Sequence, residues 1–161
     1  MTELSSNATK LTCNDCQLNH QGTYHITVRV QNGAGVYTVE TTDEIKVDLT
    51  PPIVNKVVPV TDVTSCITNC TLVFNVTFFD RESGVESCSY AIRNSNHMVT
   101  SFLNNGARKT VEATGLQLVA GERYYTAVRC DNNLGLVTEQ VSTIPVLVDD
   151  TPPTKVTENL L

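Results

Sequence analysis

Tryptophan is absent from this sequence, aromatic residues make up only 6% of it, and lysine and arginine together number 11 against 17 acidic residues. The longest basic run is Arg108-Lys109, whereas a nucleic-acid-binding surface needs lysine and arginine clustered on one face. Attraction to an anionic membrane surface needs a similar cluster. No apolar stretch approaches the roughly 20 residues of a membrane-spanning helix. We therefore expect no nucleic-acid partner and no direct membrane insertion.

The motifs of common catalytic sites are also missing. The three histidines, His20, His25 and His97, are scattered along the chain, and no GxSxG, HExxH or phosphate-binding loop occurs. Gly33-Ala34-Gly35 begins like a dinucleotide-binding fingerprint, but it lacks the third glycine and precedes a predicted strand instead of a helix. We expect a protein that is not an enzyme and that uses no cofactor.

What the sequence does contain is a repeat with a spacing of 100 residues. Apolar residues alternate through the first copy at Tyr24, Ile26, Val28 and Val30, which predicts a strand with one buried face. Both copies then reach Asn- and Gly-containing turns, a second strand and a Thr-Pro-Pro sequence that cannot continue a central strand. The matched positions are Tyr24/Tyr124, Val28/Val128, Arg29/Arg129, Asn32/Asn132 and Gly35/Gly135. A period of this length indicates tandem domains.

Between the two Pro-Pro pairs the sequence predicts seven short strands, the pattern of a β-sandwich. Phe74, Val76 and Phe78 are predicted to point inward from the second strand, and Cys88, Tyr90 and Ile92 from the third. The predicted strands are 53–60 (A), 71–79 (B), 88–93 (C), 98–102 (C′), 109–113 (E), 123–130 (F) and 138–148 (G).

Three short motifs in this order resemble fibronectin type III-like repeats. They are Glu82-Ser83-Gly84-Val85 before strand C, Gly115-Leu116 before strand F, and Val-Asp-x-Thr-Pro-Pro at the end of each copy. The resemblance implies an all-β, immunoglobulin-like antiparallel sandwich, with Tyr24 and Tyr124 in the position of the family's tyrosine corner. The strand-B tryptophan of many family members is missing.

The resemblance divides the chain into a truncated repeat over 1–52, a complete domain over 53–153 and a linker to a further domain over 154–161. The first segment would contain only strands E, F and G. Such a piece would leave Leu18, Ile26, Val28 and Val30 without an opposing sheet. We therefore expect strands upstream of this sequence, together with any signal peptide.

The six cysteines are predicted to form disulfides. Cys88 and Cys130 lie on the inward faces of neighbouring antiparallel strands C and F, so a direct bridge is geometrically plausible. Cys66 with Cys70 and Cys13 with Cys16 are local pairs for which small-loop disulfides are favoured, although Cys13 and Cys16 could instead pair with upstream strands. A redox CxxC centre lacks its strand-to-helix context, and a zinc site from both pairs and His20 would have to bridge two domains.

Modification and calcium sites are the remaining candidates. Asn7, Asn69 and Asn75 each begin an N-glycosylation sequon, and alternation places Asn75 on the outer face of strand B. The carboxylates of Asp80 and Glu82 in the B–C loop, and of Asp149 and Asp150 beside a Pro-Pro joint, are weak calcium candidates, because a calcium ion needs six to eight oxygen ligands. Solvated charges and turns are the favoured interpretation.

These observations lead to the hypothesis of a structural or adhesive module in an extracellular or cell-surface protein. Its glycosylated, disulfide-bonded repeats would contact protein partners through loops or sheet faces and would contact neighbouring domains of the same chain. Two alternatives are an accessory domain of a secreted enzyme and a carbohydrate-binding module. The second alternative normally requires exposed aromatic side chains, for which Tyr37, Phe79 and Tyr125 are the candidates.

Overall fold

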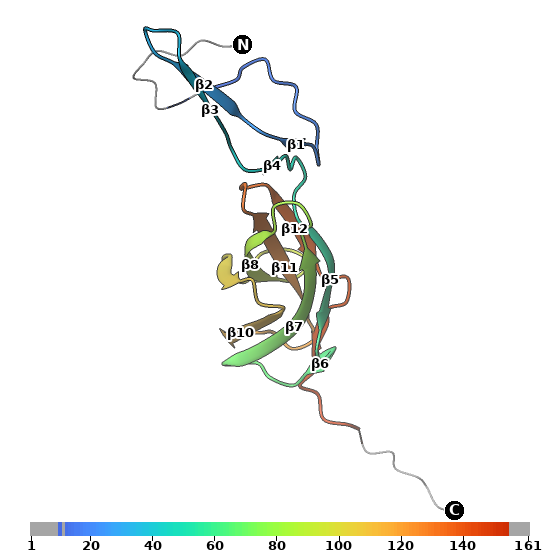
Figure 1. The fold of residues 1–161 in the computed structure, drawn as a ribbon. Coiled ribbons are helices and arrows are strands. Elements are labelled where there is room, and N and C mark those ends of the chain that lie inside the picture. Colours follow the sequence, from blue (N-terminus) through green and yellow to red (C-terminus); the bar gives the residue numbers. More distant parts are fainter. Residues whose placement is uncertain (1–9, 11, 155–161) are drawn as a thin grey trace, which may run out of the picture. The chain divides into compact units, whose positions relative to one another are not determined.

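The computed structural model describes residue 10 and residues 12–154, and every regular element in that part of the chain is a β-strand (Figure 1). The chain divides into two compact units between Asp48 and Leu49, a few residues before the boundary expected at 52/53. No helix within the described residues is long and apolar enough to cross a membrane.

The second unit is built from two sheets packed together, an arrangement consistent with a β-sandwich (Figure 1). One sheet has the strand order β10-β7-β5, and the other has the order β6-β13-β11-β8-β9 with β12 also paired to β11. The strands are β5 (Ile53–Pro59), β6 (Val63–Thr64), β7 (Cys70–Phe79), β8 (Val85–Arg93), β9 (Leu103–Gly106), β10 (Thr110–Leu116), β11 (Arg123–Asn132), β12 (Val137–Val141) and β13 (Val146–Val148).

The core of this unit lies between the two sheets. Alternation along β7 buries Leu72, Phe74 and Val76 and leaves Thr71, Asn75 and Thr77 exposed. The buried side chains of β7 pack in one cluster with the alternate residues of β8, β10 and β11, as period-2 strands on two facing sheets require. The burial predicted for Phe74, Val76, Cys88, Tyr90 and Ile92 agrees with the structure, and Phe78 is partly buried against the cluster.

Two of the predicted strands were misplaced. The strand expected over 98–102 lies at β9, Leu103–Gly106, and the expected segment contributes only a single bridge between Met98 and Arg93. The strand expected over 138–148 is broken into β12 and β13. Pro145 stands between these two pieces and, since it has no N–H to donate, it interrupts the ladder there. The short strand β6, parallel to β13, was not predicted.

The first unit contains two two-stranded sheets. β2 (Thr27–Gln31) pairs with β3 (Tyr37–Thr41), and β1 (Thr23–Tyr24) pairs with β4 (Ile45–Lys46). These strands occupy the positions expected for F and G. The expected strand E is not found, because no strand precedes Thr23 within residues 10 and 12–22. Strand E of a sandwich pairs with strand B, and the described part of this unit provides no such partner.

The 100-residue repeat extends to individual hydrogen bonds. The hydroxyl of Tyr124 accepts a bond from the backbone N–H of Val119, five residues upstream, at 2.9 Å. The hydroxyl of Tyr24 accepts one from the N–H of Asn19 at the same distance. This is the geometry of a tyrosine corner, and it occurs in both units at the positions that the resemblance implied.

We expect Tyr124→Phe to destabilise the second unit by about 1–3 kcal/mol, because it leaves the N–H of Val119 without its acceptor. Urea unfolding followed by circular dichroism measures this change. Tyr125→Phe, one residue along on the half-buried outer face, is the matched control and should change the unfolding free energy little. Equal effects of the two substitutions would contradict a specific role for the corner.

Candidate functional sites

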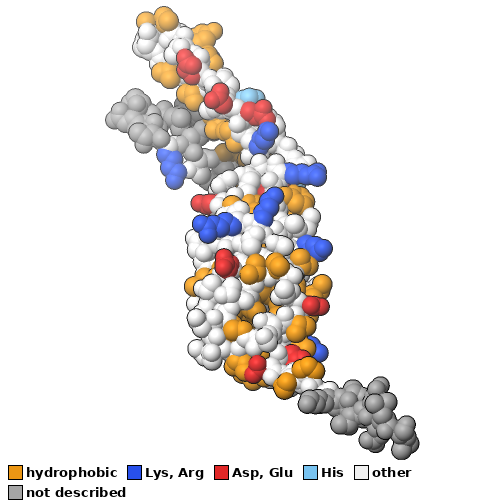
Figure 2. All heavy atoms as spheres, turned by 90° about the horizontal axis from the view of Figure 1, so that it is seen from below, with side chains coloured by type: hydrophobic (Ala, Val, Ile, Leu, Met, Phe, Trp, Pro, Cys, Tyr) orange, Lys and Arg blue, Asp and Glu red, His pale blue; other side chains and the backbone are white. Residues whose placement is uncertain are grey.

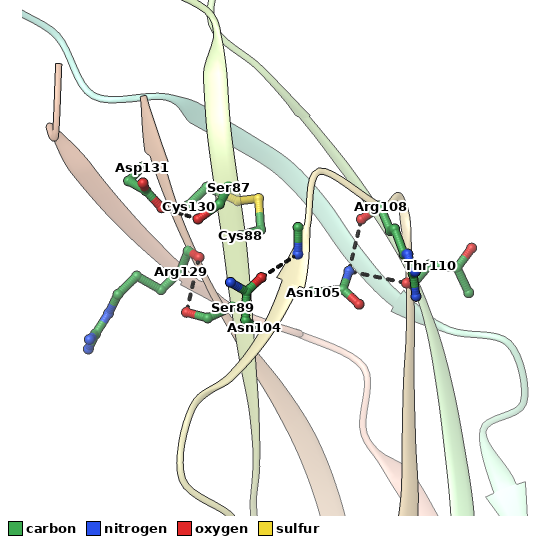
Figure 3. Close-up of a disulfide and its surroundings, with 11 residues drawn as sticks. Ser87, Cys88, Ser89, Asn104, Asn105, Arg108, Thr110, Arg129, Cys130 and Asp131 are labelled. Carbon is green, nitrogen blue, oxygen red and sulfur yellow. Dashed lines mark hydrogen bonds between the residues drawn. A yellow bond between two sulfur atoms is a disulfide. The ribbon is translucent and has the colours of Figure 1, made fainter. Parts of the chain in front are cut away.

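The disulfide between Cys88 and Cys130 joins β8 to β11 directly across the sheet (Figure 3). The two residues face each other in the strand register, their Cα atoms are 4.1 Å apart, and both side chains are fully buried. This spacing is that of the narrow, non-hydrogen-bonded pair of an antiparallel ladder. On the opposite side of the same strands, the Ser87 hydroxyl donates to the Asp131 carboxylate at 2.8 Å. The pairing is the one expected from the sequence.

The two local cysteine pairs also form disulfides, Cys13 with Cys16 and Cys66 with Cys70. All six cysteines are therefore oxidised and none is free. Zinc binds cysteine as a thiolate, and the sulfurs of these four cysteines are instead joined in pairs. His20, the fifth candidate ligand, lies instead with its Nδ1 3.8 Å from the Asp48 carboxylate.

We expect removal of the long-range disulfide to cost far more stability than removal of a local one. Closing the 42-residue separation of Cys88 and Cys130 constrains the unfolded chain by about 4 kcal/mol, against about 2 kcal/mol for a short loop such as 66–70. The double variants Cys88→Ala/Cys130→Ala and Cys66→Ala/Cys70→Ala, compared by urea unfolding, test this order. A larger loss from the local pair would contradict it.

Two of the three sequons have asparagines whose surroundings are described. Asn75 is exposed in the middle of β7, on the outer face of the three-stranded sheet. Asn69 is exposed beside the buried Cys70, in the left-handed conformation with φ 54°. Both side chains are thus accessible to a glycosylating enzyme. Asn7 lies outside the described residues.

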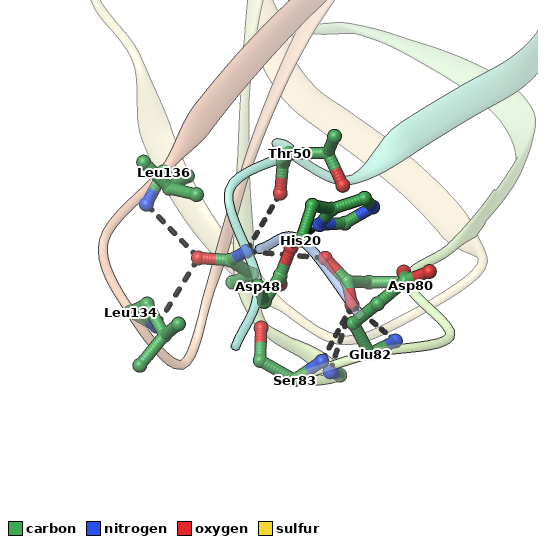
Figure 4. A network of polar contacts seen from close by, with 10 residues as sticks. His20, Asp48, Thr50, Asp80, Glu82, Ser83, Leu134 and Leu136 are labelled. Atoms are coloured by element: carbon green, nitrogen blue, oxygen red, sulfur yellow. Dashed lines mark hydrogen bonds and ion pairs between the residues drawn. The ribbon is translucent and has the colours of Figure 1, made fainter. Parts of the chain in front are cut away.

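The carboxylate of Asp80 is already bound by the protein (Figure 4). Its Oδ1 accepts three backbone bonds at 2.9–3.0 Å, from the N–H groups of Glu82, Ser83 and Gly84. Its Oδ2 accepts a fourth bond, from Asn132, at 3.1 Å. Asp80 therefore shapes the turn between β7 and β8, an Asx-type arrangement.

Of the other calcium candidates, Glu82 lies in the same turn as Asp80, whereas Asp149 and Asp150 follow β13 in another part of the second unit. Asp149 directly follows β13, and its N–H donates to the carbonyl of Thr64. Asp80 instead directly follows β7, at the end where that strand pairs with the start of β5. The hydroxyl and N–H of Thr151 donate to the Asp149 carboxylate and lower its pKa. No cluster of three or more His, Cys, Asp or Glu side chains suited to a metal ion occurs among the described residues.

Asn132 is the site residue whose role the sequence did not indicate. It is fully buried at the end of β11, and its Oδ1 accepts bonds from the N–H groups of Leu134 and Leu136 (Figure 4). Its Nδ2 donates to Asp80 and to the carbonyl of Thr50, both at 3.1 Å. One amide thus ties together the β11–β12 hairpin, the β7–β8 turn and the segment that enters β5. Its recurrence as Asn32 was the available signal.

We expect Asn132→Ala to destabilise the second unit by about 3 kcal/mol, because several polar groups at a buried position lose their partners together. Asn32→Ala is the matched control. Its Oδ1 accepts the equivalent bonds from Ala34 and Val36, but the residue is exposed, so water can replace them. Urea unfolding of the second unit should not respond to the control, and a similar loss from both variants would refute this account of Asn132.

The two aromatic candidates for sugar stacking in the second unit, Phe79 and Tyr125, do not share a sheet face. Tyr37 belongs to the first unit, while Phe79 and Tyr125 lie on the outer faces of opposite sheets of the second unit. Arg129 lies 4.2 Å from the ring centroid of Phe102 and forms an ion pair with Glu139 at 2.8 Å. Charges of both signs are scattered over the face seen in Figure 2, without a continuous basic patch.

Comparisons with known proteins identify no relative: no protein-family model matches the chain, and no curated protein sequence matches it.

Proposed function

We propose that this chain is a stretch of tandem fibronectin type III-like β-sandwich repeats that acts as a structural or adhesive module of an extracellular or cell-surface protein. The observation that carries the proposal is the disulfide-bonded, two-sheet second unit. The pairing of β11 with β8 and β12 supports it, because the C, F and G strands of such sandwiches pair in this order, and so does the tyrosine corner at the start of β11. The same corner in the first unit supports the interpretation as a repeat.

Oxidised cysteines support an extracellular location. Three disulfides are present in 161 residues and no cysteine is left free. Stable disulfides form in secreted proteins, whereas cytosolic thiols are kept reduced. An accessible sequon on an exposed strand face fits the same compartment.

A glycan on Asn75 would direct partners to the opposite sheet. Because Asn75 projects from the middle strand of the β10-β7-β5 sheet, a bulky glycan there would cover much of that sheet's outer face. The outer face of β8, β11 and β12 would remain available. It presents Tyr125, Arg129 and Phe102, and tyrosine and arginine are the residue types that dominate binding energy at protein interfaces.

A cell-attachment experiment tests this proposal. The chain is secreted from eukaryotic cells with an added signal peptide, purified and coupled to beads. We expect three linked peptide pairs in a non-reducing digest and attachment of the beads to cells. Tyr125→Ala/Arg129→Glu should weaken attachment by about tenfold, the loss expected from one hot-spot contact. Lys56→Glu, a charge reversal on the glycan-bearing face, is the matched control.

Free thiols in the secreted chain would remove the compartment argument. Two outcomes would refute an adhesive role toward proteins. The beads would attach to no cell type, or they would attach only to immobilised glycans.

A further inference from the structure

The inward face of β2 in the first unit is exposed although its counterpart in the second unit is buried. Ile26, which directly precedes β2, and Val28 and Val30 within it are 40%, 38% and 61% exposed. The residues 100 positions later, Thr126, Val128 and Cys130, are 0%, 2% and 0% exposed. The alternation that fills a core in β11 therefore leaves an apolar stripe at the surface in β2.

The leucine ahead of the tyrosine corner shows the same contrast. Leu118 is 3% exposed and belongs to the core cluster, whereas Leu18 is 46% exposed. Gln17 precedes it as Gln117 precedes Leu118. The correspondence between the two units thus starts before the corner and continues through β2.

One edge of β2 also lacks a neighbouring strand within the described residues. β11 pairs with β8 on one side and β12 on the other, whereas β2 pairs with β3 only. Because Cys88 and Cys130 form the narrow, non-hydrogen-bonded pair, the backbone groups of the residues on either side of Cys130 point toward β8. Their counterparts in β2, Arg29 and Gln31, together with Thr27, point toward the open edge.

The second unit shows what covers such a strand. There, β8 occupies the edge of β11, and the β10-β7-β5 sheet covers its inward face with Leu72, Phe74, Val76, Val111 and Ala113. All of these strands lie within residues 49–116.

We propose that the edge and inward face of β2 form an acceptor surface for a segment of the same strand pattern as residues 49–116. The segment adds an antiparallel strand to β2 and closes an apolar sheet over Ile26, Val28 and Val30. In the second unit, β8 pairs Tyr90 with Val128 and Cys88 with Cys130. In the same register, the added strand places its equivalent of Tyr90 opposite Val28 and its equivalent of Cys88 opposite Val30. Since Val30 cannot form a disulfide, that second residue is apolar.

An extended chain tests the acceptor surface. In this variant, residues 1–16 are replaced by a second copy of residues 49–116 that carries Cys88→Val. The copy is joined directly to Gln17, so the spacing of the repeat is kept, and residues 17–161 are unchanged. Hydrogen exchange of the Thr27, Arg29 and Gln31 amides is compared with that in the original chain. We expect exchange to slow by about 100-fold, toward the rates of Ala127, Arg129 and Asp131 in the same molecule.

A second variant tests the register independently of global folding. It keeps the appended Cys88 and carries Val30→Cys, and a non-reducing digest should link these two cysteines as Cys88 and Cys130 are linked in the second unit. In the first variant, Val28→Asp should restore fast exchange, whereas Glu40→Asp, on the paired strand β3, should not.

Unchanged exchange in the first variant together with no link in the second would overturn the proposal. Sedimentation of the original chain tests the other possible occupant, a second copy of this chain. A concentration-dependent dimer in which the same amides exchange slowly would assign the surface to that second copy and overturn the proposal. The acceptor surface rests on the repeat in the proposed function but not on its extracellular or adhesive role, so the exchange test can fail while secretion with linked cysteines and cell attachment succeed.

Discussion

The second unit depends on the position of β11 between two strands and beneath a facing sheet. Its inward residues fill the core, its edges satisfy the ladders of β8 and β12, and its Cys130 provides the covalent link to β8. The two polar residues that fix its ends, Tyr124 and Asn132, act on the loops on either side of it. A strand with these neighbours has few unsatisfied backbone groups and little apolar surface exposed to water.

The strand β2 repeats the local chemistry of β11 without most of its neighbours. The tyrosine corner that precedes it and the asparagine-bound turn that follows it form with partners at the equivalent positions, and at nearly the same distances as in the second unit. Local hydrogen bonds are therefore specified by the residues close to them in sequence. Burial is not, because Val28 and Val128 are the same residue type and only the second is covered by a sheet.

Sequence reasoning succeeded where a periodic pattern carries the information. The alternation in β7, β8 and β11 predicted their inward faces and hence the pairing of Cys88 with Cys130, and the resemblance to fibronectin type III-like repeats implied both tyrosine corners. It failed where one residue overrides the pattern: Pro145 divides the last strand, and the segment around Met98 lacks the pairing that β9 provides. These outcomes depend on backbone hydrogen bonds, which alternation of side chains does not encode.

The polar candidates show why charge alone was a poor guide to a site. Asp80 was considered for calcium because it is acidic and lies with Glu82 in the loop between strands B and C. All of its bonds in the structure instead go to the turn that follows it and to Asn132. A carboxylate that accepts four hydrogen bonds from its own domain would have to give some of them up to bind a cation, and each costs free energy to break. The loop end of this unit is thus held together by its own polar groups, which gives Asp80 a structural role in the turn between β7 and β8.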